Sequence, residues 1–259
     1  MSCLIKLEGV SKSYSAPDGE GNTLVLKDIS LRIAQGSFST FFGPNGCGKS
    51  TLMSIVGQLE TYDKGELSVS TSGPGKIAFV FQDYRQSLLP WKNVEENILF
   101  PLRLGGISRT DGRKKLEKLV EYLDFDMDYR ARTYTLSGGQ AQLTGILRAL
   151  VTEPEILVLD EPFSALDYQT NLFLREKMLQ IRENNRDLTI LFVSHDLDEA
   201  LFLGDEAYIL SKAPARIVGG MPLKIPFGHP RSPTLLTEPV FGELKAKAFS
   251  SFQKGILTE

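Results

Sequence analysis

The feature that most constrains the fold is an eight-residue run that matches the pattern G-x-x-x-x-G-K-[ST]. The run reads Gly43-Pro44-Asn45-Gly46-Cys47-Gly48-Lys49-Ser50. It follows a short apolar stretch, residues 38–42, and precedes residues 51–59, which have helical character. Glycines let consecutive backbone N–H groups turn inward, and a following helix N-terminus adds a positive dipole end. The sequence therefore predicts a strand, a phosphate-binding loop and a helix in an α/β fold.

Within this loop, side chains and backbone have separate predicted roles. Lys49 is expected to reach the β- and γ-phosphates of a nucleoside triphosphate, and the hydroxyl of Ser50 to bind Mg²⁺. Further phosphate contacts are expected from Gly43, Asn45, Gly46, Cys47, Gly48 and Thr51. The alternative, an accidental glycine-rich turn, does not explain the order of strand, loop and helix.

A second motif, Asp160-Glu161, ends the apolar run of residues 156–159. In an open parallel sheet, functional groups lie at the carboxyl ends of strands. This is the Walker B pattern, in which Asp160 would bind Mg²⁺ indirectly and Glu161 would polarise the attacking water as general base. The alternative, N-capping of the following helix, fits either acid alone but leaves the phosphate loop unexplained. The two motifs together predict a phosphate-loop nucleoside triphosphatase.

The remaining pattern fits such a fold. Residues 4–14 and 24–33 alternate apolar and polar side chains around the turn cluster Ala16-Pro17-Asp18-Gly19, which predicts antiparallel strands. Continuous apolar runs at 77–81, 156–159 and 190–193 predict parallel strands buried on both faces. Helical apolar stripes, interpreted as core packing, comprise Leu116, Leu119, Val120 and Leu123, and then Leu174, Met178 and Ile181. A last helix is expected near residues 243–252.

Composition excludes several classes of protein. The 259 residues include 29 Lys and Arg against 32 Asp and Glu, a net charge of −3, so no general positive field attracts nucleic acid. Neither an apolar run of 18 residues nor a leader pattern is present, so we expect the chain to stay in the cytoplasm. Cys3 and Cys47 are too few for a disulfide framework and are expected to be reduced thiols.

A third motif, Leu136-Ser137-Gly138-Gly139-Gln140, precedes Asp160. Serine and two glycines at a helix start offer outward-facing N–H groups to an anion, although alone they could be an ordinary helix cap. The segment resembles the signature motif of ABC ATPases. The resemblance implies a head-to-tail pair of cassettes, in which Ser137 to Gln140 of one chain meet the γ-phosphate held by Lys49 of the other.

Further elements are similar to the same family. Gln82 matches the glutamine that faces Mg²⁺ and the attacking water, and His195 the switch histidine near the γ-phosphate. Ser164-Ala165-Leu166-Asp167 resembles the D-loop. Tyr14 is expected to stack on adenine, with core or surface packing as the alternative. The resemblance implies ATP rather than GTP, and Mg²⁺.

The resemblance also implies an architecture and partners. We expect a RecA-like core, an antiparallel β subdomain and a helical signature subdomain over about residues 83–150, all within a cassette of residues 1–220, followed by a tail of residues 221–259. Permease subunits would be separate chains. The second ATPase would be another copy of this chain or a paralogue. A substrate-binding protein would act indirectly, through the permease. The cassette would lie on the cytoplasmic face of the inner membrane.

Three short segments resemble the nitrate/sulfonate/taurine importer group, whose members move small anions, bicarbonate included. They are Leu88-Leu89-Pro90-Trp91, Ala215-Arg216-Ile217 and Gly228-His229-Pro230-Arg231. Trp91 with its leucine neighbours is expected either to form an apolar pocket for a permease coupling helix or to be plain core. The chain departs from the pattern in two places. The segment from Gln82 to Leu88 is about two residues longer than the shortest family versions. Leu143 stands where a basic residue is common, so weaker packing of the signature helix against the core is expected.

Other functions are weighed against this one. A soluble ABC ATPase acting on DNA or ribosomes would carry a long coiled coil or two cassettes, and neither pattern is present. A nucleotide-binding scaffold without turnover would not need Glu161 and His195. An exporter ATPase is the nearest alternative.

Overall fold

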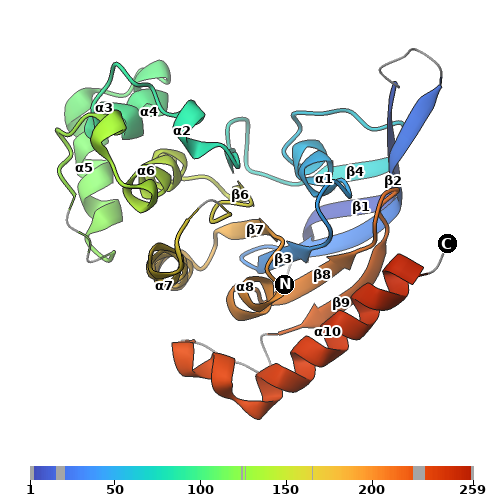
Figure 1. Cartoon of the computed structure of the whole chain (residues 1–259). Coiled ribbons are helices and arrows are strands. Elements are labelled where there is room, and N and C mark those ends of the chain that lie inside the picture. Colours follow the sequence, from blue (N-terminus) through green and yellow to red (C-terminus); the bar gives the residue numbers. More distant parts are fainter. Residues whose placement is uncertain are drawn as a thin grey trace. The chain divides into compact units, whose positions relative to one another are not determined.

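The structure is a computed structural model that describes residues 3–15, 21–123, 125, 127–164, 166–223 and 231–257 (Figure 1). The predicted turn at residues 16–19, Ala165 of the D-loop motif, and residues 228–230 of the late Gly-His-Pro-Arg segment lie outside the described residues. The chain divides into two compact units. The first comprises Met1–Ser72 with Thr189–Glu259, and the second Gly73–Leu188.

The first unit contains an antiparallel sheet with the strand order β2-β1-β4. Strand β1 (Cys3–Ser15) pairs with β2 (Asn22–Ala34) on one side and with β4 (Lys64–Val69) on the other. The apolar residues at alternate positions of β1 and β2 are buried, because one face of the sheet is packed and the other is wet. The predicted antiparallel pair is confirmed.

The described part of the same unit contains four further strands around the phosphate loop. Strand β3 (Phe38–Phe42) runs parallel to β7 (Thr189–Ser194) and to β8 (Glu206–Leu210), and β9 (Ile217–Pro222) is antiparallel to β8. Every residue of β3 and β7 is buried, as their continuous apolar runs predicted.

The helices of the first unit pack on these strands. In the described residues they are α1 (Lys49–Val56), α8 (Leu197–Leu203), the short helix η2 (Pro233–Thr237) and α10 (Pro239–Leu257). Helix α10 extends the helix predicted near residues 243–252 in both directions and lies along β8 and β9 (Figure 1). Its Phe252 ring contacts Phe42, with the ring centroids 5.1 Å apart.

The second unit is mostly helical. Strand β5 (Ile77–Val80) pairs in parallel with β6 (Ile156–Asp160). Its helices are α2 (Tyr84–Ser87), α3 (Val94–Ile98), α4 (Phe100–Leu104), α5 (Arg109–Val120), η1 (Thr133–Thr135), α6 (Gly138–Leu150) and α7 (Tyr168–Asn184). Between these two strands along the chain, the described residues are thus mostly helical. Helix α5 ends at Val120, so Leu123 is buried core but lies outside the helix.

Parallel pairing brings strand ends together within each unit. Phe42 at the end of β3 lies opposite Ser194 at the end of β7. In the second unit, Val80 of β5 lies opposite Leu159 of β6. The residues that follow each pair therefore leave the sheet at a common edge. None of the helices in the described part of the chain is long and apolar enough to cross a membrane.

Candidate active site

The loop from Gly43 to Gly48 leaves β3 and ends at α1, as predicted. Gly48 is the N-cap of α1 with φ +113°, and a Cβ there would lie 2.8 Å from Val25 Cγ1 and 2.9 Å from Leu26 Cδ2 of β2. Only glycine tolerates both the backbone conformation and the close approach. The first turn of α1 carries no acidic side chain, so the positive end of its dipole is not neutralised locally.

Lys49 is the first residue of α1 and is buried. Its Nζ donates hydrogen bonds to the carbonyl oxygens of Gly43 at 2.9 Å and Pro44 at 3.0 Å. The ammonium group is therefore held inside the loop by carbonyls of the loop itself. Cys47 is also buried, whereas Asn45 and Ser50 are exposed.

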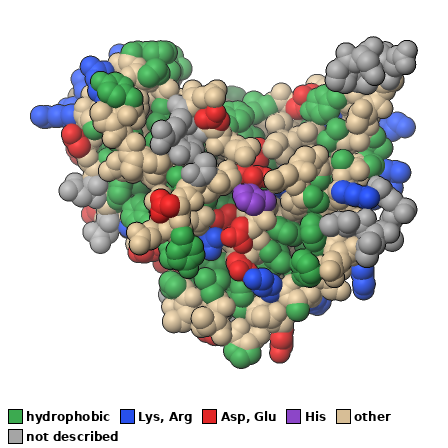
Figure 2. Space-filling view, viewed as in Figure 1, with side chains coloured by type: hydrophobic (Ala, Val, Ile, Leu, Met, Phe, Trp, Pro, Cys, Tyr) green, Lys and Arg blue, Asp and Glu red, His purple; other side chains and the backbone are tan. Residues whose placement is uncertain are grey.

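His195 follows the last residue of β7 and is exposed, and a histidine side chain is visible on the face drawn in Figure 2 (purple). Its neighbours are fixed by side-chain hydrogen bonds. Ser194 Oγ accepts from the backbone N–H of Asp196 at 2.9 Å, and Asp196 caps α8 by accepting from Asp198 N at 2.8 Å. Because Phe42 and Ser194 are paired, His195 emerges beside the start of the phosphate loop.

Tyr14 lies near the end of β1 with 39% of its surface exposed. The ammonium group of Lys12 lies 5.0 Å from its ring centroid. The Tyr14 hydroxyl is 3.4 Å from Glu60 Oε2, to which it donates a hydrogen bond. The ring is thus accessible for stacking, and it is not a core residue.

In the second unit, the signature residues form the start of α6. Ser137 is the N-cap, its Oγ accepts from Gln140 N at 3.3 Å, and Gln140 Oε1 accepts from Ser137 N at 3.0 Å. This is a capping box, so the helix-cap alternative describes what Ser137 does within one chain. Ser137 is exposed, whereas Gly139 is buried. Leu143 is fully buried, and the expected weaker packing at this position stays a prediction.

Asp167, the last residue of the D-loop motif, is the N-cap of α7. Thr170 donates to it twice, from its backbone N–H at 3.0 Å and from its hydroxyl at 2.6 Å. These hydrogen bonds lower the pKa of the Asp167 carboxyl, the hydroxyl of Thr170 contributing most.

Asp160 ends β6 and is buried, and Glu161 follows it with a backbone φ of +44°. A positive φ is strained for a residue with a Cβ, and such strain is typical of functional positions. Because Asp167 caps α7, neither Asp160 nor Glu161 serves as the cap of that helix. Gln82 is exposed and follows β5, whose end is paired with that of β6.

The structure thus gathers the predicted residues into two sets, one in each unit. Tyr14, residues 43–51 and His195 belong to the first unit, and Gln82, residues 137–140, Asp160, Glu161 and Asp167 to the second.

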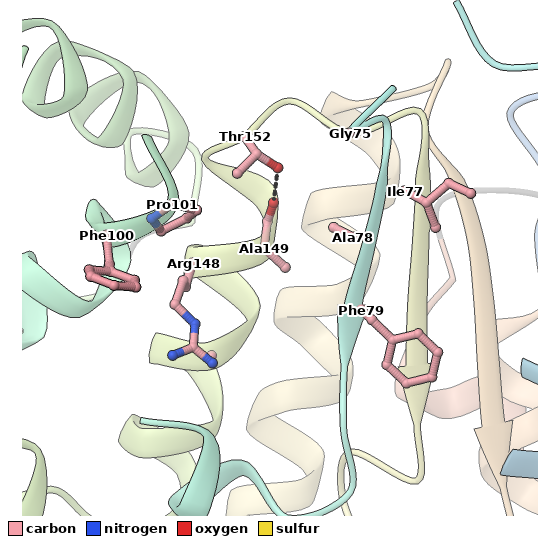
Figure 3. Close-up of a pocket in the computed structure, with 10 residues that line it drawn as sticks. Gly75, Ile77, Ala78, Phe79, Phe100, Pro101, Arg148, Ala149 and Thr152 are labelled. Atoms are coloured by element: carbon pink, nitrogen blue, oxygen red, sulfur yellow. Dashed lines mark hydrogen bonds between the residues drawn. The ribbon is translucent and has the colours of Figure 1, made fainter. Parts of the chain in front are cut away.

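A pocket of about 310 Å³ lies in the second unit, lined by β5, α4 and the C-terminal half of α6 (Figure 3). Phe100 and Pro101 of α4 line one side, and Arg148 and Thr152 follow along α6 and its end. The Arg148 guanidinium donates to the carbonyl oxygen of Ser87 at 2.6 Å and to its Oγ at 3.0 Å, and burial lowers the pKa of the Arg148 guanidinium. Gly145 opens the pocket, because a Cβ there would meet nothing within 4 Å.

Leu88 and Trp91, which were expected either to form an apolar pocket or to be plain core, differ in burial. Leu88 is 5% exposed and packs with Leu136, Ala141 and Leu166, so it is core. Trp91 is 69% exposed, and its carbonyl oxygen accepts a hydrogen bond from Arg132 Nη1 at 2.8 Å. Leu88 is therefore core, Trp91 is not, and the contact of Trp91 with a permease helix stays a prediction.

Sequence reasoning missed several residues of these sites. Lys12 carried a signal, since residues two apart on a strand share a face and Lys12 precedes Tyr14 by two. Glu60 and Arg148 carried none, because each reaches its partner through tertiary packing. Thr170 lies three residues after Asp167, which is a typical N-cap spacing.

A glycine loop between a parallel strand and a helix, in a chain where a second parallel strand ends in two acids, defines a phosphate-loop nucleotide-binding protein of the α/β class. A family model described as ABC transporter matches residues 26–164. The chain belongs to this ABC transporter family.

Relatives and solved structures agree with this assignment. The chain is 38% identical over 241 residues to the aliphatic sulfonates import ATP-binding protein SsuB of Bacillus subtilis, covering 92% of this chain and 90% of the relative. It is 36% identical over 247 residues to the nitrate import ATP-binding protein NrtD of Synechococcus elongatus, covering 92% and 88%. The fold is similar to the dimeric structure of MJ0796, a bacterial ABC transporter cassette, with a TM-score of 0.72 and 29% identity over 85% of this chain and 98% of that one. A post-hydrolysis state of MJ0796 bound to ADP and Pi is similar at a TM-score of 0.71, with 28% identity over the same shares of the two chains.

Proposed function

We propose that this chain is the ATP-hydrolysing subunit of an ABC importer for a small anion of the nitrate, sulfonate/taurine or bicarbonate type. The observation that carries the proposal is that one chain holds both a phosphate loop around Lys49 and a separate signature helix capped by Ser137. The likeness to sulfonate and nitrate import proteins along 90% and 88% of their lengths supports import.

The nucleotide would bind to the first unit. Lys49 would exchange its loop carbonyls for the β- and γ-phosphates, the backbone N–H groups of the loop would hold the phosphate oxygens, and Tyr14 would stack on adenine. The signature residues Ser137 to Gln140, with Asp167, would come from a second ATPase chain, another copy or a paralogue. The dimeric state of the MJ0796 cassette supports this arrangement.

The residues proposed for Mg²⁺ have the donors that this ion prefers. Ser50 offers a hydroxyl, Gln82 an amide carbonyl and Asp160 a carboxylate, all hard oxygen atoms. Few protein ligands are needed, because Mg²⁺ usually keeps waters and binds substrate phosphates as well. When bound, the ion would neutralise charge on the phosphate oxygens. Gln82 and Asp160 leave the paired strands β5 and β6 at a common edge, which supports a shared task.

We assign the general base to Glu161, with His195 near the γ-phosphate and Gln82 near the attacking water. The strained φ of Glu161 supports a functional position. In the purified transporter, Glu161→Gln is expected to lower ATP turnover at least 100-fold while ATP still binds, because the amide cannot accept the proton. Glu117→Gln, on the exposed surface of α5, is the matched control. Wild-type turnover of Glu161→Gln would refute the assignment of the base.

The pocket lined by Phe100 and Arg148 is our candidate for the permease contact. Trp91, which precedes Phe100 in the chain, is an exposed apolar side chain that could extend this contact. A helix of a permease subunit seated there would touch Arg148, which holds Ser87, and Ser87 lies in the segment that follows Gln82. Gly145→Met would fill the pocket and is expected to reduce co-purification with the permease. Gly242→Met, on the exposed side of α10, is the matched control. Equal recovery of the permease with both variants would contradict the assignment of this pocket as the permease contact.

We further propose that residues 1–220 form the cassette, with a helical subdomain over about residues 83–150, and that residues 221–259 form a tail packed on it. The assembled chain would lie on the cytoplasmic face of the inner membrane as a peripheral subunit, and a substrate-binding protein would act through the permease. Transport by the purified complex in vesicles, with nitrate, taurine, aliphatic sulfonates and bicarbonate in parallel, would identify the solute. Co-purification with ribosomes in place of a permease would contradict a transport function.

A further inference from the structure

Lys12 is a buried charged residue behind the aromatic ring of Tyr14. It is 7% exposed, and its Nζ lies 5.0 Å from the centroid of that ring. The same Nζ donates to Glu60 Oε1 at 2.9 Å and to Thr61 Oγ1 at 3.3 Å. A buried ammonium group is costly unless it is paired and hydrogen-bonded, so this position needs its partners.

Glu60 touches both Lys12 and Tyr14. One carboxylate oxygen accepts from Lys12 and the other accepts from the Tyr14 hydroxyl at 3.4 Å. The Lys12 hydrogen bond is the main cause of a lowered pKa at Glu60, and the Glu60 hydrogen bond of a raised pKa at Lys12, so the pair is charged at neutral pH. Three side chains are thus joined through one carboxylate.

The segment that carries Glu60 is connected to the phosphate loop through helix α1. It follows α1, whose first residue is Lys49, and the N–H groups of Leu59 and Glu60 donate to the Ser54 carbonyl of that helix at 2.8 Å and 3.2 Å. A few residues on, Asp63 Oδ2 accepts from the backbone N–H of Ser13 at 2.6 Å. The strand that carries Tyr14 and the helix that begins in the phosphate loop are therefore tied together beside the ring.

We propose that Lys12 and Glu60 are positioning residues for the nucleotide base. They fix the Tyr14 ring at a set distance from the phosphate loop, with the Lys12 ammonium on one face of the ring and the base on the other. The proposal rests on the stacking role assigned to Tyr14 above. The cation is attracted to the ring face, so it holds the ring without covering the face that the base uses.

Lys12→Met removes the charge and keeps the chain length. With the purified full chain, we expect the dissociation constant for ATP to rise about 10-fold and that for inorganic triphosphate, which has no base, to change less than twofold. Lys12→Arg keeps the positive charge and is expected to stay within threefold of wild type for both ligands. Glu60→Gln, with unchanged shape, is expected to act in the same direction as Lys12→Met and serves if that variant does not fold. Lys6→Met is the matched control, because Lys6 forms an exposed 2.7 Å ion pair with Glu8 on the same strand.

A double-mutant cycle with Tyr14→Ala separates this proposal from the stacking proposal. If Lys12 positions the base through Tyr14, adding Lys12→Met to Tyr14→Ala changes ATP binding less than twofold. Unchanged ATP binding by Tyr14→Ala alone would overturn the stacking role itself. If Tyr14→Ala weakens ATP binding but Lys12→Met does not, or if Lys12→Met weakens ATP and triphosphate equally, only the positioning role is overturned.

Discussion

The Cγ2 methyl group of Thr170 lies 2.5 Å from the position that a Cβ on Gly139 would occupy. Non-bonded carbon atoms prefer separations of about 3.5–4.0 Å, so no larger residue fits at position 139 without movement. Thr170 cannot rotate away freely, because its hydroxyl donates to Asp167 at 2.6 Å. The start of the signature helix and the capped start of α7 therefore approach each other through this glycine.

Gly139→Ala is expected to displace Thr170 from Asp167 and to lower ATP turnover about 10-fold or more. Thr170→Ser removes the clashing methyl and keeps the hydroxyl, so the double variant Gly139→Ala/Thr170→Ser should recover most of the activity. Turnover of the four proteins in the cycle is the measurement. Gly112→Ala, on helix α5 where the nearest atom to a Cβ is 3.4 Å away, controls for the gain in helix propensity. No recovery in the double variant would mean that the added methyl acts on the nucleotide side and not on α7.

Gly48→Ala is expected to abolish ATP binding, raising the dissociation constant at least 100-fold. The left-handed backbone costs about 1–2 kcal/mol for a residue with a Cβ, and the overlap with Val25 and Leu26 adds to this cost. Gly46 also has a positive φ, +73°, but a Cβ there meets nothing within 4 Å. Gly46→Ala should therefore weaken binding much less. Isothermal titration with ATP compares the two, and equal losses would show that space at position 48 is unimportant.

Features formed by residues close together in the sequence could be predicted from the sequence. The strands β3, β6 and β7 were predicted because each is a short run of apolar residues that is fully buried. Helix α1 was predicted to begin near residue 51 but begins at Lys49, because the last motif residues already form its first turn.

Features made by distant segments could not be predicted from the sequence. Lys12 and Glu60 are 48 residues apart, and no spacing rule joins them. Leu88 sits in an apolar run next to exposed Trp91, and only the packing of Leu136 and Ala141 decides that Leu88 is core. The strain at Glu161 is likewise a property of the folded backbone, since the sequence Asp-Glu-Pro gives no sign of it.

A cluster of one acid and two arginines predicts a pH dependence of stability in the second unit. Glu95 of α3 is buried and accepts hydrogen bonds from Arg109 at 2.8 Å and from Arg113. The Arg113 hydrogen bond is the main cause that lowers the pKa of the Glu95 carboxyl from 4.5 to about 2. A carboxyl with a lowered pKa stabilises the fold fully above its unfolded pKa, near 4.5, and loses that contribution as the pH falls toward 2.

Glu95→Gln is therefore expected to lower the free energy of unfolding at pH 7 by about 1–2 kcal/mol, since both arginine side chains are more than half exposed and solvent screens the pair. The difference from wild type should shrink as the pH falls from 4.5 toward 2, because protonated Glu95 resembles glutamine in charge. Urea unfolding at several pH values, followed by the fluorescence of Trp91, the single tryptophan, measures the second unit directly. Glu121→Gln, at an exposed position directly after α5, is the control and should match wild type within about 0.5 kcal/mol. A difference between Glu95→Gln and wild type that stays constant down to pH 2.5 would show that the carboxylate charge is not what stabilises this cluster.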